Sequence, residues 1–116
     1  MKKQLSDIKV YYNHKYIKIK KHPYYLALKY HSKELYLRYI KTSFVQSKKK
    51  TGNWQGFLEL LDKIKSKGFN NKKDSIVIDG DLICKHGRHR ICMFMYLYGG
   101  NTLLKIKNNR LEKVYI

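Results

Sequence analysis

Residues 76–99 read IVIDGDLICKHGRHRICMFMYLYG, and this stretch decides the fold. A short apolar run leads to Asp79-Gly80, a pair typical of hairpin turns, and a second apolar run follows. After Gly87 the apolar residues keep helical spacing until Gly99 ends the pattern. The sequence therefore predicts, in order, a strand over 75–78, a return strand over 81–84, a tight turn at Gly87 and a helix over 88–98.

Two further helices are predicted before this unit. Asn53 is a capping residue and Gly68 a natural helix stop. Between them the apolar side chains fall at helical spacing: Trp54, Phe57, Leu58, Leu61 and Ile64. An earlier helix over 33–44 begins after Ser32 as its N-cap, with three side chains directed to the core: Leu35, Tyr39 and Ile40.

The remaining segments indicate strands. Residues 8–20 alternate apolar and polar in two runs around Asn13-His14, which predicts a strand pair or one interrupted strand. Pro23 ends that pattern, and the aromatic segment 24–30 fits no single element. Closing strands are predicted over 102–107 and 112–116. The order of elements favours a single α+β domain over residues 1–116, with a small mixed β-sheet and about three helices.

The composition is strongly basic. The chain has 26 Lys and Arg against 8 Asp and Glu, a formal net charge of +18. Such a surface attracts nucleic acid, nucleotides, anionic lipid or a phosphorylated glycan, although a lysine-rich proteome would produce the same composition. Tyrosines interleaved with lysines resemble a single-strand nucleic-acid face, and equally fit tyrosines at the wet edge of a core. They are Tyr11, Tyr12, Tyr16, Tyr24, Tyr25, Tyr30, Tyr36 and Tyr39.

The cysteine spacing and the distribution of apolar residues indicate the cellular compartment in which the protein is found. Cys84 and Cys92 form neither a CxxC pair nor a zinc spacing, so free thiols in a reducing cytoplasm are expected. The first residues lack the apolar run of a signal peptide, and no stretch approaches the roughly 20 apolar residues of a membrane span. We therefore expect a cytoplasmic protein. Trp54, Cys92 and Met95 are expected in the core, whereas His22, next to Pro23, fits a site or the surface equally.

The turn at Gly87 has the chemistry of an anion site. The first turn of a helix presents N–H groups without helical partners, and the aligned peptide dipoles add partial positive charge. Glycine permits a sharp turn and a close approach by a ligand. Arginine, lysine and histidine side chains add donors to phosphate oxygens. The candidate phosphate-binding residues are Lys85, His86, Gly87, Arg88, His89 and Arg90. The alternative is a basic surface loop before a core helix.

A hairpin with a glycine turn, followed by G-x-H-R at the start of a helix, resembles the signature of the ParB/sulfiredoxin superfamily. The match runs from Ile76 to Ile91, and the flanking helix and strand extend it to residues 54–107. The resemblance implies that Gly87, His89 and Arg90 cradle a nucleotide phosphate.

Members of that superfamily differ in what they do with the phosphate. Sulfiredoxins carry a cysteine between the Gly and the His, where this chain has Arg88, so sulfinic acid reduction is not expected. ParB proteins carry a Glu or similar residue after the Gly and an Arg at the third place, which here are Arg88 and His89. They also have a helix-turn-helix domain downstream, whereas nine residues follow Lys107 here. A role in chromosome partition is therefore not expected.

The chain also resembles a third branch of the superfamily, the free-serine kinases, which carry G-x-H-R and transfer phosphate to a small hydroxyl. This likeness implies an ATP-, ADP- or CTP-dependent phosphotransferase or nucleotidase that uses Mg²⁺. Such chemistry needs a carboxylate, for which the candidates are Asp79, Asp81 and Glu34. Asp79 also fits a plain turn residue.

Two other functions remain open at this point. The net charge of +18 favours a nucleic-acid-binding module that uses the same turn for backbone phosphate and has no catalytic activity. The scarcity of acidic residues favours a scaffold that binds a protein or a phosphorylated glycan.

Overall fold

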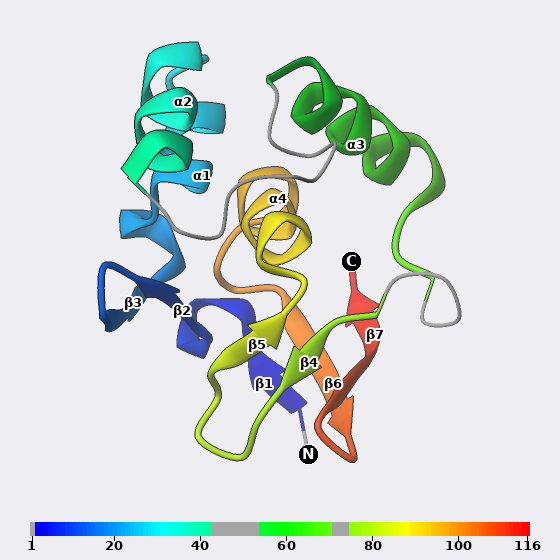
Figure 1. The fold of residues 1–116 in the computed structure, drawn as a ribbon. Helices are drawn as coiled ribbons and strands as arrows, with labels where there is room; N and C mark the ends of the chain where they lie inside the picture. The colour runs from blue at the N-terminus through cyan, green and yellow to red at the C-terminus, as the bar shows by residue number, and fades with distance from the viewer. Residues whose placement is uncertain (1, 43–53, 71–74) are drawn as a thin grey trace.

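An antiparallel sheet of five strands forms one layer of the computed structural model, which describes residues 2–42, 54–70 and 75–116 (Figure 1). Its strands are β1 (Lys2–Gln4), β4 (Val77–Ile78), β5 (Cys84–His86), β6 (Leu103–Lys107) and β7 (Arg110–Tyr115), in the spatial order β1-β6-β7-β4-β5. The predicted α+β class is confirmed. The sheet is antiparallel rather than mixed, because the parallel contact among the described residues is one isolated bridge between Lys9 and Ile83.

A separate two-stranded sheet consists of β2 (Lys9–Tyr12) and β3 (Lys15–Lys18). The turn between them is Asn13-His14, with φ of 50° and 64°. Positive φ at both central residues is the geometry that joins two strands in a tight hairpin. Of the two predictions for residues 8–20, the strand pair is therefore confirmed.

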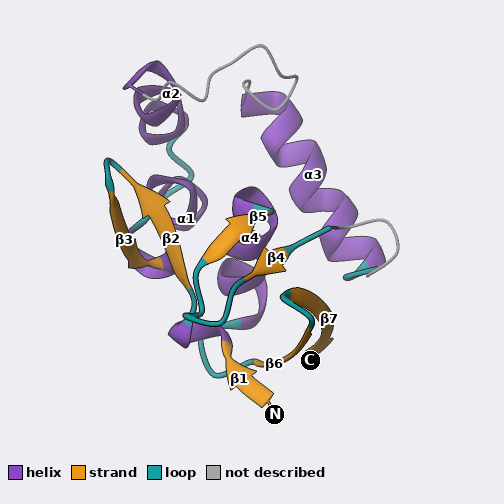
Figure 2. Ribbon diagram, turned by 60° about the horizontal axis from the view of Figure 1, so that its bottom comes forward, coloured by secondary structure: helices purple, strands orange, loops and turns teal. Residues whose placement is uncertain are grey.

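Four α-helices lie in the described part of the chain: α1 (Pro23–Lys29), α2 (Lys33–Thr42), α3 (Trp54–Lys67) and α4 (Arg88–Tyr98). Short 3₁₀ helices precede β2 and α1: η1 (Leu5–Asp7) and η2 (Ile19–Lys21). The helices gather on one side of the five-stranded sheet, with α4 central (Figure 2).

The predicted capping residues act as expected. Ser32 Oγ accepts a hydrogen bond from the N–H of Leu35 at 3.2 Å, at the start of α2. Gly68 ends α3 with φ of 71°, and its N–H donates to the carbonyl of Ile64 at 2.8 Å. Residues 43–44 of the predicted helix, the predicted cap Asn53, and the side chains of Tyr39 and Ile40 lie outside the described residues.

Helix α1 was not predicted, because Pro23 was interpreted as an interruption. Proline is in fact favoured at the first position of a helix, where its missing N–H is not needed. His22 is the N-cap, and its ring Nδ1 accepts a hydrogen bond from the N–H of Tyr24 at 3.0 Å. The aromatic segment after Pro23 is therefore a helix that buries Tyr24.

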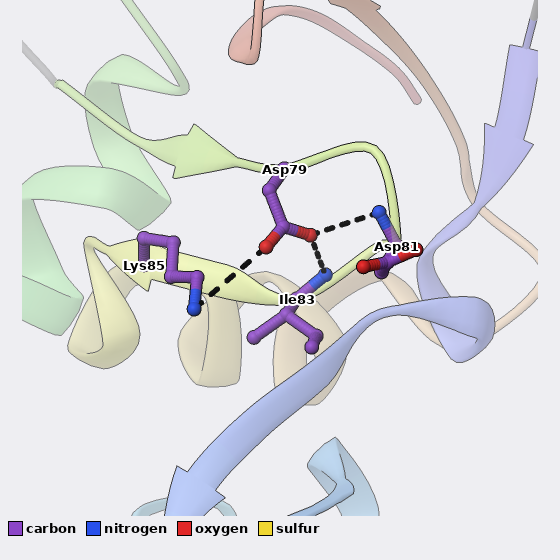
Figure 3. Close-up of polar contacts among 4 residues, drawn as sticks. All are labelled: Asp79, Asp81, Ile83 and Lys85. Atoms are coloured by element: carbon purple, nitrogen blue, oxygen red, sulfur yellow. Dashed lines mark hydrogen bonds and ion pairs between the residues drawn. The ribbon is translucent and has the colours of Figure 1, made fainter.

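The hairpin before α4 differs from the predicted one. The return strand begins at Cys84 rather than Asp81, because Asp79 organises a longer loop (Figure 3). Asp79 Oδ1 accepts hydrogen bonds from the N–H groups of Asp81 at 2.9 Å and Ile83 at 3.1 Å. Leu82 adopts φ of 63° in this loop. A side chain that binds nearby backbone N–H groups replaces strand pairing locally.

Helix α4 forms the centre of the core. Its residues from Ile91 to Met95 are all buried, including Cys92, so the expected core positions Cys92 and Met95 are confirmed. The helix packs against α1, α3 and β5. Both cysteines are free. Trp54 is partly buried and packs against the core through Phe57 and Tyr36. Among the described residues, no helix has the length and apolar character needed to cross a membrane.

Gly87 joins the sheet to α4 and cannot be replaced without a clash. It adopts φ of 90° and ψ of 30°, in the left-handed region. A Cβ built on it would lie 2.7 Å from Cγ1 and 3.2 Å from Cα of Ile76, which is itself buried. Only glycine satisfies both the backbone angle and this close approach.

We expect Gly87→Ala to destabilise the protein more than Gly68→Ala. At Gly68 φ is also positive, but nothing lies within 4 Å of the added Cβ, so only backbone strain of about 1–2 kcal/mol applies. At Gly87 the overlap with Ile76 adds a further ~1–3 kcal/mol to the same strain. Urea unfolding followed by circular dichroism measures both free energies. Equal losses at the two positions would contradict the close approach of Gly87 to Ile76.

Candidate functional site

The candidate site is the first turn of α4. Gly87 is its N-cap, and the carbonyl of Gly87 accepts a hydrogen bond from the N–H of Ile91 at 3.0 Å. Glycine supplies no capping side chain, and the first turn holds no acidic residue. Arg88, His89 and Arg90 occupy the first three helical positions, where the helix dipole is positive.

His89 is fixed within an aromatic cluster contributed by the other helices. Its ring stacks on Tyr24 of α1, with centroids 4.2 Å apart and planes 24° apart. Phe57 of α3 meets the same ring edge-on at 5.6 Å. The Nε2 atom of His89 is shielded from solvent. The cluster consists of Tyr24, Tyr36, Trp54, Phe57 and His89. Three helices thus hold the start of α4 in place.

His22 is a site residue whose place the sequence left undecided. The structure buries it completely, with its ring 4.8 Å from that of Tyr24 and 5.7 Å from that of Tyr12. Burial and, after it, the positive charges of Arg88 and His89 together lower the pKa of His22 from 6.5 to about 3. His22 is therefore a neutral ring beside the basic turn. Its position before Pro23 was the available signal, because a histidine can cap a helix that proline begins.

Arg88 lies near several buried groups. Its charge lowers the pKa of His22 and partly offsets the raised pKa values of Cys84 and Cys92. Burial raises the pKa of Cys84 to about 11 and that of Cys92 higher still. Both thiols therefore remain protonated at neutral pH, and neither is an activated nucleophile. The Nε of Arg90 is likewise shielded from solvent.

Lys85 and His86 lie on β5, directly before the first turn of α4. Lys85 Nζ lies 3.7 Å from Oδ2 of Asp79 in the hairpin loop (Figure 3). The same Nζ atom lies 5.3 Å from the ring centroid of Tyr16. His86 is exposed, and its carbonyl accepts a hydrogen bond from the Cys84 thiol at 3.2 Å. The first turn of α4 thus carries Gly87 and three basic residues, of which Arg88 and His89 lie near His22, whereas Lys85 contacts Asp79.

The three predicted carboxylates come from the hairpin loop and from α2, not from the first turn of α4 itself. Asp79 has both carboxylate oxygens engaged, one by two backbone N–H groups and the other by Lys85, which is the behaviour of a structural turn residue. Asp81 and Glu34 are exposed, on the hairpin loop and on the first turn of α2. In the described ranges, no three His, Cys, Asp or Glu side chains form a group that could hold a metal ion.

A pocket of about 330 Å³ lies elsewhere, between η1, β2, β3 and η2. Its lining includes three lysines and one carboxylate, with an apolar side formed by Ile19 and Met95. The lining residues are Ser6, Asp7, Lys9, Lys18, Ile19, Lys20 and Met95. None of them belongs to the predicted phosphate turn.

Comparison of the chain with protein-family models, curated proteins and solved structures finds no match.

The burial of His22 predicts that the free energy of unfolding decreases in acid. The folded state keeps this ring neutral down to a pKa of about 3, whereas the unfolded chain protonates it below about 6.5, so stability falls as the pH drops between these values. His22→Asn keeps an acceptor for the Tyr24 N–H and removes the titration. We expect this variant to reduce the slope of unfolding free energy against pH, between about pH 4.5 and 6.5, by up to ~1.4 kcal/mol per pH unit.

Urea unfolding across that pH range measures the slope. The control is His14→Asn, which replaces an exposed histidine at a turn position that asparagine also tolerates. A slope that changes equally in the two variants, or in neither, would contradict a buried neutral His22.

Proposed function

We propose that the turn from Gly87 to Arg90 binds the phosphate of a nucleotide. The observation that carries the proposal is the gathering of Arg88, His89 and Arg90 on the glycine-capped first turn of α4, beside the buried ring of His22. Backbone N–H groups, a positive helix end and planar guanidinium donors are the combination that phosphate oxygens favour.

Electrostatics support the same conclusion. Burial and, after it, the positive charges of Arg88 and His89 lower the pKa of His22, so both basic groups lie near its ring. Interactions between like charges are strengthened where water is excluded, and Nε of Arg90 and Nε2 of His89 are both shielded from solvent.

The ligand in this proposal is ATP, ADP or CTP together with Mg²⁺. The described side chains offer no carboxylate group for a metal, so Mg²⁺ would be held mainly by the nucleotide phosphates and water, as is common for this ion. Mg²⁺ neutralises charge that develops on phosphate during transfer or hydrolysis. The candidate reactions are phosphoryl transfer to a small hydroxyl and nucleotide hydrolysis.

A general base for either reaction would come from Asp81 or Glu34, since Asp79 is engaged in its loop. Release of phosphate from ATP with Mg²⁺, compared between wild type, Asp81→Asn and Glu34→Gln, distinguishes an enzyme from a binding domain. If wild type releases phosphate and both variants match it, neither carboxylate is the base.

Removal of one guanidinium from the turn should weaken nucleotide binding. We expect Arg90→Ala to lower the affinity for ATP, ADP or CTP by about 10- to 100-fold, because a charge-assisted hydrogen bond to phosphate is lost. Arg90→Lys keeps the charge but loses the planar fork, so its effect should be intermediate. Isothermal titration in the presence of Mg²⁺ measures these affinities.

The control for that titration is Lys65→Ala, which removes one exposed positive charge from α3. It should bind nucleotide as wild type does. Adenosine and cytidine, which lack phosphate, should not bind. If wild type binds no nucleotide below about 1 mM, or binds adenosine as well as ATP, the proposal is wrong. The thermal midpoint of each variant without ligand separates loss of binding from loss of fold.

The nucleic-acid reading of the same turn predicts different ligand behaviour. Affinity for an oligonucleotide would then exceed that for mononucleotides and would fall steeply with salt. A scaffold that binds a protein or a phosphorylated glycan would bind neither.

A further inference from the structure

The face of the sheet opposite the buried side chains carries a row of lysines from three strands. Lys2 of β1 pairs in register with Lys105 of β6, and Lys105 pairs with Lys113 of β7. Residues directly opposite each other in a sheet direct their side chains to the same face. Lys107 pairs with Arg110 in the same way, two positions further along β6. Five cations therefore share this face.

The opposite face of the same strands is the core. Leu104 and Leu111 are buried, and Ile106, which pairs with Leu111, packs against the core. Since side chains alternate along a strand, the lysines at 105 and 107 lie away from this core, and both are exposed. The elements β1, β6 and β7 lie side by side in Figure 1. We name their outward surface, made by Lys2, Lys105, Lys107, Arg110, Lys113 and Tyr115, the basic sheet face.

Like charges directly opposite each other on neighbouring strands destabilise a sheet. The repeated pairing of cations on β1, β6 and β7 therefore needs an explanation other than stability. Lysines on an edge strand prevent sheets from pairing edge to edge, which would account for Lys2. Strands β6 and β7 are interior in the strand order, so that reason does not extend to Lys105 and Lys113. Glu112 is the one acidic residue in β1, β6 and β7, and its Oε1 forms an ion pair with Nζ of Lys105 at 3.4 Å. The face keeps a large excess of positive charge.

An aromatic ring lies among these cations. Tyr115 ends β7, and its ring centroid is 4.4 Å from Nζ of Lys2 and 4.9 Å from Nζ of Lys113. The ring is partly exposed, and it pairs in register with Leu103. Both ammonium groups lie over the ring, so a nucleic-acid base that stacks on Tyr115 takes the place of one of them. The displaced ammonium group, on a long lysine side chain, then remains within reach of the adjoining phosphates.

We propose that the basic sheet face binds single-stranded nucleic acid. The lysines contact backbone phosphates and Tyr115 stacks against a base. The combination of an exposed strand surface, a row of cations and an aromatic ring favours an unpaired strand, whose bases are free to stack, over a duplex or a lipid headgroup. This surface shares no residue with the turn from Gly87 to Arg90, so it stands independently of the nucleotide proposal.

The test is fluorescence anisotropy with a labelled single-stranded oligonucleotide of about 15 nucleotides, a length within the range that small domains occupy. The variant K105Q/K107Q/K113Q removes three charges from the basic sheet face. The matched control K63Q/K65Q/K67Q removes three exposed charges from α3. We expect the sheet variant to bind at least about tenfold more weakly at 0.15 M salt, and to reduce the slope of log affinity against log salt by about 2. The α3 variant should change the affinity less than about twofold.

The aromatic contact is tested separately. Tyr115→Ala should weaken binding about tenfold, whereas Tyr30→Ala, which removes an exposed tyrosine of α1's C-terminal end, should not. If the triple sheet variant fails to fold, K107Q/K113Q compared with K63Q/K67Q measures the same difference with fewer changes.

Three outcomes would overturn the proposal. Equal weakening by the sheet and α3 variants would mean that the net charge of the whole chain binds the strand. Binding of a duplex of the same length as tightly as the single strand, with no effect of Tyr115→Ala, would exclude base stacking. Binding of vesicles that contain phosphatidylserine, without binding of the oligonucleotide, would assign the face to a membrane surface.

Discussion

The contact between Gly87 and Ile76 is the constraint on which the rest of the structure depends. With no Cβ at Gly87, the chain passes from β5 into α4 directly against Ile76, the residue before β4. Helix α4 can then lie against the sheet with every residue from Ile91 to Met95 buried. The same contact fixes where the helix begins, and so determines which backbone groups and basic side chains form its first turn.

The position of that first turn explains the unusual surroundings of His22. Helix α1 packs against α4, and Tyr24 of α1 contacts the rings of both His22 and His89. His22 is thereby buried where Arg88 and His89 also act on it, so it stays neutral. A pKa lowered by burial and by neighbouring charges is found more often at functional sites than elsewhere.

Periodicity predicted the elements whose pattern is local. Helices α3 and α4, the start of α2 and the β2–β3 hairpin follow from spacing and capping residues, and the tight turn before α4 follows from Gly87 at the helix start. Three features did not follow. Asp79 lengthened the hairpin by binding backbone N–H groups at 81 and 83, Pro23 began a helix rather than ending a strand, and burial of His22 depends on tertiary packing. The row of cations on the sheet depends on the register between β1, β6 and β7, and the periodicity of a single segment carries no information about that register.

The pairing of β1 with β6 has a consequence for how this chain folds. Lys3 lies opposite Leu104, so β1 pairs with a strand that is distant from it in the sequence. Long-range pairings of this kind raise the contact order and slow folding, because the entropy of loop closure must be overcome before the pairing stabilises anything. During synthesis on the ribosome, β1 emerges long before β6. The hairpin of β6 and β7 and helix α4 can form from nearby contacts, whereas β1 can join the sheet only after β6 has been made.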